Sequence, residues 1–279
     1  MIYLNPEVKT ADGQDTFWDW AEREFKKSSF EIPQKLNSED IVLRYSTLGF
    51  LPVVGKSIAL CWEMYPQMQK LYGNPMYANS VLSKVYEAAQ YCTYRTVASP
   101  VSVDIYKKFG SVEVIPIGVD TNFWRPLHNK EAIRKKYGLP LNKNIGIWVG
   151  TSHHMKGFAD FIQYVSMNQE FYWIIVMGRH SKFIKEFHNA EIFSDISQSQ
   201  LLELINAADI YICTNRLNAY FMIDWEMMAC NIPFVYPSGH IPEFEVGVEP
   251  REAVFKHGWD RDSVKKCWES FFERHGIDY

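Results

Sequence analysis

The chain has 279 residues, which is long for a single core and suits two domains of ordinary size. Hydrophobic residues make up 47% of it and aromatic residues 15%, as in packed globular proteins, which argues against long disordered segments. A formal net charge of -4 provides no overall basic field, so we expect no nucleic-acid partner.

The sequence begins without a secretory signal pattern and contains no apolar run of membrane-spanning length. We therefore expect a soluble, cytoplasmic protein, and no feature of the sequence supports a peripheral membrane contact. The cysteines are odd in number, scattered and without metal-type spacing, and several lie in apolar runs. We expect them to be reduced core residues: Cys61, Cys92, Cys213, Cys230 and Cys267.

In the first part of the chain, short apolar runs alternate with helical patterns. Strands are predicted at residues 2–4, 40–44, 58–61, 93–98 and 112–116, and helices at residues 15–27 and 76–91. This alternation favours a parallel sheet covered on both faces. We interpret residues 1–118 as a first domain, with a candidate hinge at residues 117–127.

The second part of the chain repeats the pattern. A helix at residues 131–138 has a basic last turn and ends at Gly138, a good helix C-terminus. Strands are predicted at residues 145–150, 172–177 and 210–214, and helices at residues 157–167 and 200–207. Residues 119–260 form the second predicted domain, and residues 261–279 carry a last helix.

The first motif with chemical content, G-T-S-H-H-M-K-G, occupies residues 150–157. It places Gly150 at a strand end, Lys156 six residues later and Gly157 at a helix start, so that an ammonium group and free amides share one space. That arrangement suits a diphosphate. It is neither a Walker loop nor a G-x-G-x-x-G fingerprint, and on spacing alone Lys156 could equally be a solvated residue at a helix start.

The second motif, at residues 218–243, predicts a ligand loop, a short helix and a buried strand. The loop follows the strand at residues 210–214, and ligands of open α/β sheets bind at the carboxyl ends of strands. Glu226 falls near the start of the short helix, where the helix dipole favours a carboxylate that can reach ligand hydroxyls. Asn231 suits the left-handed cap that ends this helix.

Four segments then occur in the order of a known family: V-I-P-I-G-V-D-T-N-F-W-R-P, G-T-S-H-H-M-K-G, S-Q-S-Q-L-L-E-L-I-N-A-A-D-I-Y-I, and N-A-Y-F-M-I-D-W-E-M-M-A-C-N-I-P-F-V with S-G-H-I-P-E. Together they resemble the retaining, nucleotide-sugar-dependent glycosyltransferases of family 4. The resemblance covers residues 97–279 and implies the α/β fold called GT-B, in which two Rossmann-like domains face each other across a cleft. It also implies that the second domain binds the nucleotide sugar and that the last helix returns to the first domain, which is unusually short here.

By this resemblance, Lys156 matches the lysine that binds the diphosphate of the sugar donor, where it would stabilise charge on the leaving group. Glu226 matches the second glutamate of a pair separated by seven residues, which holds the ribose hydroxyls. Thr151 stands where the family usually has an arginine. Three other cations could compensate, although each could equally be an ordinary surface residue: His153, His154 and Arg179.

Asn218 stands where the family has the first glutamate, which lies beside the donor sugar. An asparagine can hydrogen-bond sugar hydroxyls but offers no negative charge to a developing oxocarbenium ion. A different donor sugar, a slower enzyme and loss of catalysis are the three explanations. The amides that contact sugar and phosphate in the family would here belong to Ala219, Tyr220, Phe221 and Met222.

On the acceptor side, the resemblance assigns Gly13, Trp62 and Glu63, with Glu63 as a candidate base for the acceptor hydroxyl. Trp62, Tyr65 and Trp124 could stack on sugar rings, although core packing is the more frequent fate of such side chains. The D-R-D segment at residues 260–262 is similar to a metal-binding motif, but it opens the last helix, where capping is the favoured role. We therefore expect no metal and no cofactor besides the nucleotide-sugar substrate.

The resulting hypothesis is a metal-independent, retaining hexosyltransferase that moves a sugar from a nucleoside-diphosphate sugar to a hydroxyl of a glycan or another acceptor. Two alternatives remain open, and Asn218 and Thr151 motivate the first of them. One is a catalytically impaired module that binds nucleotide or glycan, and the other is a sugar-nucleotide hydrolase. The sequence names neither the sugar, the base nor the acceptor.

Overall fold

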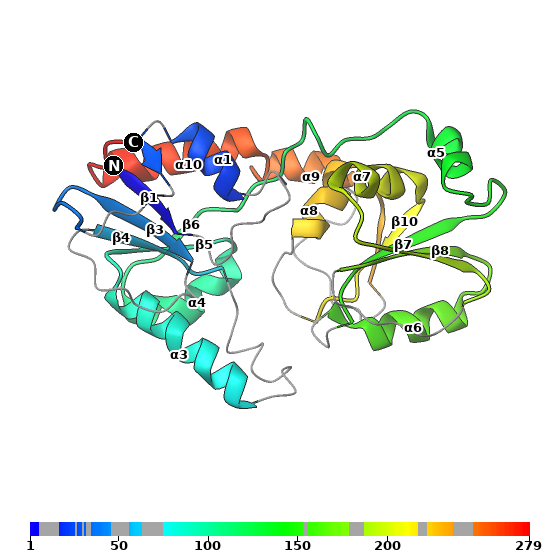
Figure 1. Ribbon diagram of the computed structural model, residues 1–279, viewed down its shortest axis with the longest axis horizontal. Helices are drawn as coiled ribbons and strands as arrows, with labels where there is room; N and C mark the ends of the chain where they lie inside the picture. The colour runs from blue at the N-terminus through cyan, green and yellow to red at the C-terminus, as the bar shows by residue number, and fades with distance from the viewer. Residues whose placement is uncertain are drawn as a thin grey trace. The chain divides into compact units, whose positions relative to one another are not determined.

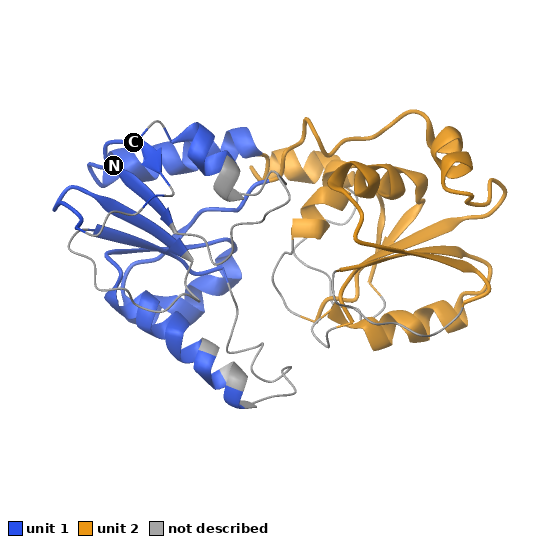
Figure 2. Ribbon diagram, viewed as in Figure 1, with its two compact units in different colours: residues 1–118, 261–279 blue, residues 119–260 orange. Residues whose placement is uncertain are grey.

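A computed structural model describes residues 1–5, 17–25, 27–29, 31, 35–45, 56–62, 75–152, 156–178, 187–216, 222–236 and 248–279. The chain divides into two compact units (Figure 2). Unit 1 comprises Met1–Gly118 and Arg261–Tyr279, and unit 2 comprises Val119–Asp260. Among the described residues, no helix combines the length and the apolar character that a membrane crossing requires.

Unit 1 contains a parallel sheet whose strands lie in the order β2-β1-β3-β4-β5-β6 (Figure 1). The strands are β1 (Ile2–Asn5), β2 (Ser28–Ser29), β3 (Ile41–Tyr45), β4 (Lys56–Leu60), β5 (Tyr94–Val97) and β6 (Glu113–Val114). The accompanying helices are α1 (Phe17–Glu24), α3 (Pro75–Tyr91), α4 (Val103–Tyr106) and α10 (Arg261–Arg274), with 3-10 turns at Pro100–Ser102 and Lys107–Phe109. Helices α1 and α10 cover one face of this sheet, and α3 and α4 the other.

The last helix, α10, is part of the hydrophobic core of unit 1. Its buried residues Trp268, Phe271 and Phe272 pack in one cluster with Ile2 and Leu4 of β1. The D-R-D segment opens this helix: Asp260 is buried, and Asp262 lies in the first helical turn. About 140 residues separate the two parts of unit 1, so its core depends on sequence from both ends of the chain.

Unit 2 contains a second parallel sheet, in the order β11-β10-β7-β8-β9. Its strands are β7 (Ile145–Gly150), β8 (Tyr172–Met177), β9 (Ala190–Ser194), β10 (Ile210–Ile212) and β11 (Phe234–Val235). Its helices are α5 (Lys130–Lys136), α6 (Phe158–Met167), α7 (Gln198–Ala207), α8 (Met222–Ala229) and α9 (Pro250–Lys256). Helix α6 lies on one face of the sheet, and α7, α8 and α9 on the other (Figure 1).

The elements of unit 2 follow the predicted pattern with a few corrections. The predicted strand at residues 210–214 is shorter, because only Ile210–Ile212 is paired as strand. The strand predicted after α8 is β11, which has two residues and is half-buried rather than buried. Asn231 has a φ of 60°, so the left-handed cap predicted there is confirmed. Trp124 is a core residue with only 4% of its surface exposed, so it offers no face to a sugar.

The cysteines are free thiols, as predicted, and all of them except the half-buried Cys267 are buried. Burial raises the pKa of Cys61 and Cys213 well above the usual thiol value. These thiols therefore stay protonated at neutral pH, which is typical of structural rather than reactive cysteines.

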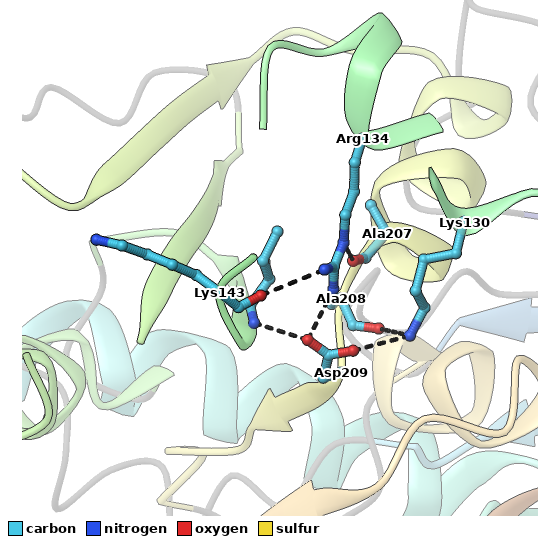
Figure 3. A network of polar contacts seen from close by, with 7 residues as sticks. Lys130, Arg134, Lys143, Ala207, Ala208 and Asp209 are labelled. Carbon is cyan, nitrogen blue, oxygen red and sulfur yellow. Dashed lines mark hydrogen bonds and ion pairs between the residues drawn. The ribbon is translucent and has the colours of Figure 1, made fainter. Parts of the chain in front are cut away.

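A polar network fixes α5 to the amino ends of β7 and β10 (Figure 3). The Asp209 carboxylate accepts hydrogen bonds from Lys130 Nζ at 3.0 Å, from Arg134 Nη2 at 2.7 Å and from the Ile145 amide at 2.8 Å. Arg134 also donates from Nε to the carbonyl oxygen of Ala207 at 2.9 Å. The Asp209 carboxylate thus joins α5 to the amino ends of the neighbouring strands β7 and β10.

Replacing Asp209 by asparagine should destabilise unit 2 by about 2–3 kcal/mol at pH 7, because the buried Arg134 loses its counter-charge. Burial alone would raise the pKa of Asp209, but the hydrogen bonds from Ile145, Lys130 and Arg134 outweigh it and lower that pKa. A lowered folded-state pKa means that this stabilisation is complete above the unfolded pKa of about 4 and is lost as the pH falls through the folded value.

Urea unfolding at pH 7 and pH 3 measures both effects. Asp209→Asn should lower the free energy of unfolding at pH 7 and show a smaller further loss at pH 3 than the wild type. Glu131→Gln is the matched control, because Glu131 pairs with Lys135 on the exposed face of the same helix. Equal losses for the two variants at pH 7 would contradict the role given to Asp209.

Candidate functional site

The strand order of unit 2 contains a topological switch point between β7 and β10. The chain proceeds from β7 outward to β8 and β9 on one side, and from β10 to β11 on the other. The two strands are parallel neighbours, with Ile210 paired to Gly146 and Tyr211 to Ile147. In open parallel sheets, ligands bind outside the carboxyl ends of the strands at such a point.

Thr214 connects the segments that follow these two strands. Its hydroxyl donates a hydrogen bond to the carbonyl oxygen of Lys156 at 2.7 Å and accepts one from the indole Nε1 of Trp148 at 2.9 Å. Trp148 and Thr214 are each only 2% exposed. The main chain of Lys156, just before α6, is therefore fixed to the carboxyl end of β10.

Glycines at both ends of the 150–157 motif allow this close approach. Gly157 has a φ of 63° and is the N-cap residue of α6, and a Cβ there would lie 2.0 Å from the carbonyl oxygen of Thr214. A Cβ on Gly150 would lie 2.9 Å from the ring of Trp148 and 3.6 Å from the Cβ of Lys156. Neither position can carry a larger side chain without movement of its neighbours.

Thr151, at the position where the family usually has an arginine, directly follows β7 and lies beside Gly178, which follows β8. The carbonyl oxygen of Gly150 accepts a hydrogen bond from the Gly178 amide at 2.8 Å. A Cβ built on Gly178 would lie 2.9 Å from Cγ2 of Thr151. The methyl group of Thr151 is therefore in close contact with the backbone that follows β8.

Arg216 brings a guanidinium group to the first turn of α6. Its Nε and Nη2 each donate to an oxygen of the Asp160 carboxylate at 2.8 Å, which is the bidentate geometry that arginine forms with carboxylates. The sequence motifs did not indicate this residue. The available signal was its position two residues beyond the end of the predicted strand at residues 210–214.

Asp224 fixes the start of α8 to the same strand end. This carboxylate is 1% exposed and accepts hydrogen bonds from the Tyr211 hydroxyl at 3.0 Å and from Asn215 Nδ2 at 3.3 Å. Burial, with the charge of Asp224 added to it, raises the pKa of Tyr211 well above its usual value. The phenol therefore remains a hydrogen-bond donor at neutral pH.

Three consecutive residues, beginning two positions after the end of β10, thus anchor two helices. Thr214 contacts Lys156 just before α6, Asn215 contacts Asp224 in the first turn of α8, and Arg216 contacts Asp160 in the first turn of α6. The first turns of α6 and α8 are therefore both held at the carboxyl end of β10. Helix amino ends carry unpaired amides and a partial positive charge, which suits a phosphate-bearing ligand.

Other residues predicted for the site have different surroundings. Glu226 is half-buried in α8, two positions after the buried Asp224, and Met222 is the first residue of that helix. Trp62 is half-buried in unit 1 and packs against the cluster that contains Ile2 and Leu4. Several predicted residues lie outside the described part of the chain: Gly13, Glu63, Tyr65, His153, His154, Arg179, Asn218, Ala219, Tyr220 and Phe221.

Neither a protein-family model nor a curated protein sequence matches the chain. Solved structures match it over most of its length. Sucrose-phosphate synthase from Thermosynechococcus elongatus has a TM-score of 0.67 and 13% identity, over 84% of this chain and 73% of that one. HepE from Anabaena, solved with UDP and glucose, has a TM-score of 0.63 and 13% identity, over 84% and 78% of the two chains.

A glycosyltransferase from Rickettsia africae also matches, with a TM-score of 0.62 and 15% identity, over 98% of this chain and 97% of that one. At such identities, structural similarity establishes the fold, whereas the activity has to be argued from the residues of the site. Two of the matches cover the chain nearly end to end, so the similarity includes both parallel sheets and the helices on their two faces. The chain therefore has the GT-B fold of these glycosyltransferases, as its motifs predicted.

Proposed function

We propose that the protein is a retaining glycosyltransferase that moves a sugar from a nucleoside-diphosphate sugar to a hydroxyl of a glycan or another acceptor. The observation that carries this proposal is that the first turns of α6 and α8 are both held at the carboxyl end of β10, with Lys156 fixed between β7 and α6. Structural neighbours support a sugar nucleotide as ligand, because HepE was solved with UDP and with UDP-glucose.

In this proposal, unit 2 binds the sugar nucleotide with its diphosphate at the start of α6. The ammonium group of Lys156 and the helix dipole balance the charge that grows on the diphosphate as the bond from the anomeric carbon to the phosphate oxygen breaks. The charge balance comes from the chain itself, so the reaction proposed here uses no metal ion. Glu226 in α8 would hold the ribose hydroxyls.

The acceptor hydroxyl would attack the anomeric carbon from the face that the diphosphate leaves, which retains the anomeric configuration. A bond forms between the acceptor oxygen and the anomeric carbon, and the acceptor proton passes to the departing diphosphate oxygen. Asn218 would contact the donor sugar as a hydrogen-bonding amide. Because it carries no charge, the oxocarbenium-like transition state would depend more heavily on Lys156 and the helix amino ends.

Nucleotide release from a panel of UDP-, GDP- and ADP-sugars, with and without glycan acceptors, tests this proposal. We expect release of one nucleoside diphosphate that depends on an acceptor, and a product whose anomeric proton coupling in NMR equals that of the donor sugar. Inverted configuration would contradict the retaining mechanism. Release without any acceptor would instead indicate a hydrolase.

Asn218 and Thr151 differ from the residues that the family has at these positions. This difference motivates one rival function, a module that binds nucleotide without turning it over. The same panel separates this rival from an enzyme. Thermal stabilisation by a nucleoside diphosphate, combined with no turnover of any donor and any acceptor, would favour the binding module.

A further inference from the structure

We infer that Thr214 is a positioning residue for the donor diphosphate: its buried hydroxyl orients the peptide between Lys156 and Gly157. This inference rests on the proposed function, because it assigns a role to a side chain that acts on the diphosphate only through its neighbours. No sequence motif indicated Thr214, which lies after β10 and 58 positions from Lys156.

The hydrogen bonds of Thr214 leave its hydroxyl a single orientation. The hydroxyl donates a hydrogen bond to the Lys156 carbonyl oxygen at 2.7 Å, and its oxygen accepts one from Nε1 of Trp148 at 2.9 Å. The indole itself is held by α6, because its ring stacks on Phe161 with a centroid distance of 5.1 Å and an interplanar angle of 17°. Trp148 of β7, Thr214 and the start of α6 are therefore joined by buried hydrogen bonds and ring packing.

The orientation of one carbonyl fixes that of the next amide. In a trans peptide, the carbonyl group of one residue and the N–H of the following residue point in opposite directions. Because the Lys156 carbonyl points toward Thr214, the Gly157 amide points away from β10. The first amides of α6 have no acceptor inside the helix, so the same constraint sets the direction in which the helix presents them.

Gly157 makes this arrangement possible and Thr214 maintains it. A left-handed residue with a φ of 63° turns the chain from the Lys156 carbonyl into the first turn of α6, where the Gly157 carbonyl accepts from the Phe161 amide at 3.0 Å. Without the Thr214 hydroxyl, the peptide between Lys156 and Gly157 could rotate, and both the lysine side chain and the helix amides would lose their fixed direction.

Thr214→Val tests the inference, because valine keeps the shape of threonine and removes both hydrogen bonds. Calorimetric titrations with UDP, GDP and ADP identify the diphosphate that binds, and that diphosphate and its free nucleoside are then titrated into each variant. Thr214→Val should weaken diphosphate binding about tenfold. The affinity for the free nucleoside should stay within about twofold, and Thr214→Ser, which keeps the hydroxyl, should retain most of the wild-type affinity.

The dependence on Lys156 separates positioning from a loss of folding. In a Lys156→Ala background, Thr214→Val should weaken diphosphate binding by a clearly smaller factor, because only the helix amides then remain to be oriented. Trp148→Phe provides a second variant, since it keeps an aromatic ring and removes the Nε1 donor. It should weaken diphosphate binding by a smaller factor than Thr214→Val and leave the nucleoside affinity unchanged.

An equal loss of nucleoside and diphosphate affinity in Thr214→Val, or a loss that persists in full in the Lys156→Ala background, would overturn the inference. So would unchanged diphosphate affinity in Thr214→Val while Lys156→Ala weakens it, and in that case the proposed function would stand. If Lys156→Ala itself leaves diphosphate binding unchanged, the phosphate site of the proposed function is wrong.

Discussion

Replacing Lys156 by alanine is expected to lower kcat with the preferred sugar nucleotide by about 10²- to 10³-fold. The physical reason is that, in the proposed reaction, the lysine faces charge that develops on the diphosphate only as the bond to the anomeric carbon breaks. Its contribution is therefore larger in the transition state than in the ground state, and kcat should fall more than KM rises. Initial rates of nucleotide release, measured over a range of donor concentrations, separate the two constants.

Lys143→Ala is the matched control for this variant. Lys143 is exposed and lies before the amino end of β7, whereas Lys156 follows the carboxyl end of the same strand. Its main-chain carbonyl, which accepts from Arg134, is kept in the alanine variant. Lys143→Ala should retain wild-type kinetics, and comparable losses in the two variants would mean that overall charge, rather than the site at α6, is being measured.

Gly157→Ala is expected to destabilise unit 2 by about 3–5 kcal/mol. Two penalties combine at this position. The backbone has a φ of 63°, which disfavours any residue with a Cβ, and that Cβ would lie 2.0 Å from the carbonyl oxygen of Thr214. Relief of the clash requires movement of α6 away from β10, so the variant should also lose nucleotide binding.

Gly138→Ala isolates the first penalty. Gly138 has a φ of 67°, but apart from its chain neighbours no heavy atom of a described residue lies within 4 Å of a Cβ built there. This variant should cost only about 1 kcal/mol. Urea unfolding of the two variants gives the difference directly, and equal destabilisation would show that the contact between Gly157 and Thr214 is not tight in solution.

The strands of unit 2 were predictable because burial on both faces leaves a plain signal in the sequence. The runs at residues 145–150 and 172–177 contain no charged residue and are rich in large apolar side chains, and both strands have the predicted bounds. Strand β9 was not predicted, since it lies at the sheet edge with half-buried and exposed residues and contains Glu191. Helix α9 was missed although Pro250 stands at its first turn, a recognised start signal.

The candidate site was predictable only in part. The 150–157 motif pointed to Lys156 and Gly157 because glycines and a lysine between a strand and a helix are a local pattern. Thr214 and Arg216 were missed, since their partners Lys156 and Asp160 lie 58 and 56 positions away. Spacing along the sequence cannot reveal contacts that depend on which strands become neighbours, and here the pairing of β7 with β10 decides them.

The crystal structure of the protein with its preferred nucleoside diphosphate tests the central claim most directly. We expect the diphosphate to lie at the amino end of α6, within hydrogen-bond distance of Lys156 Nζ and of the first helix amides, with the ribose near Glu226. A nucleotide bound elsewhere in unit 2, or in unit 1 with this helix end vacant, would contradict it.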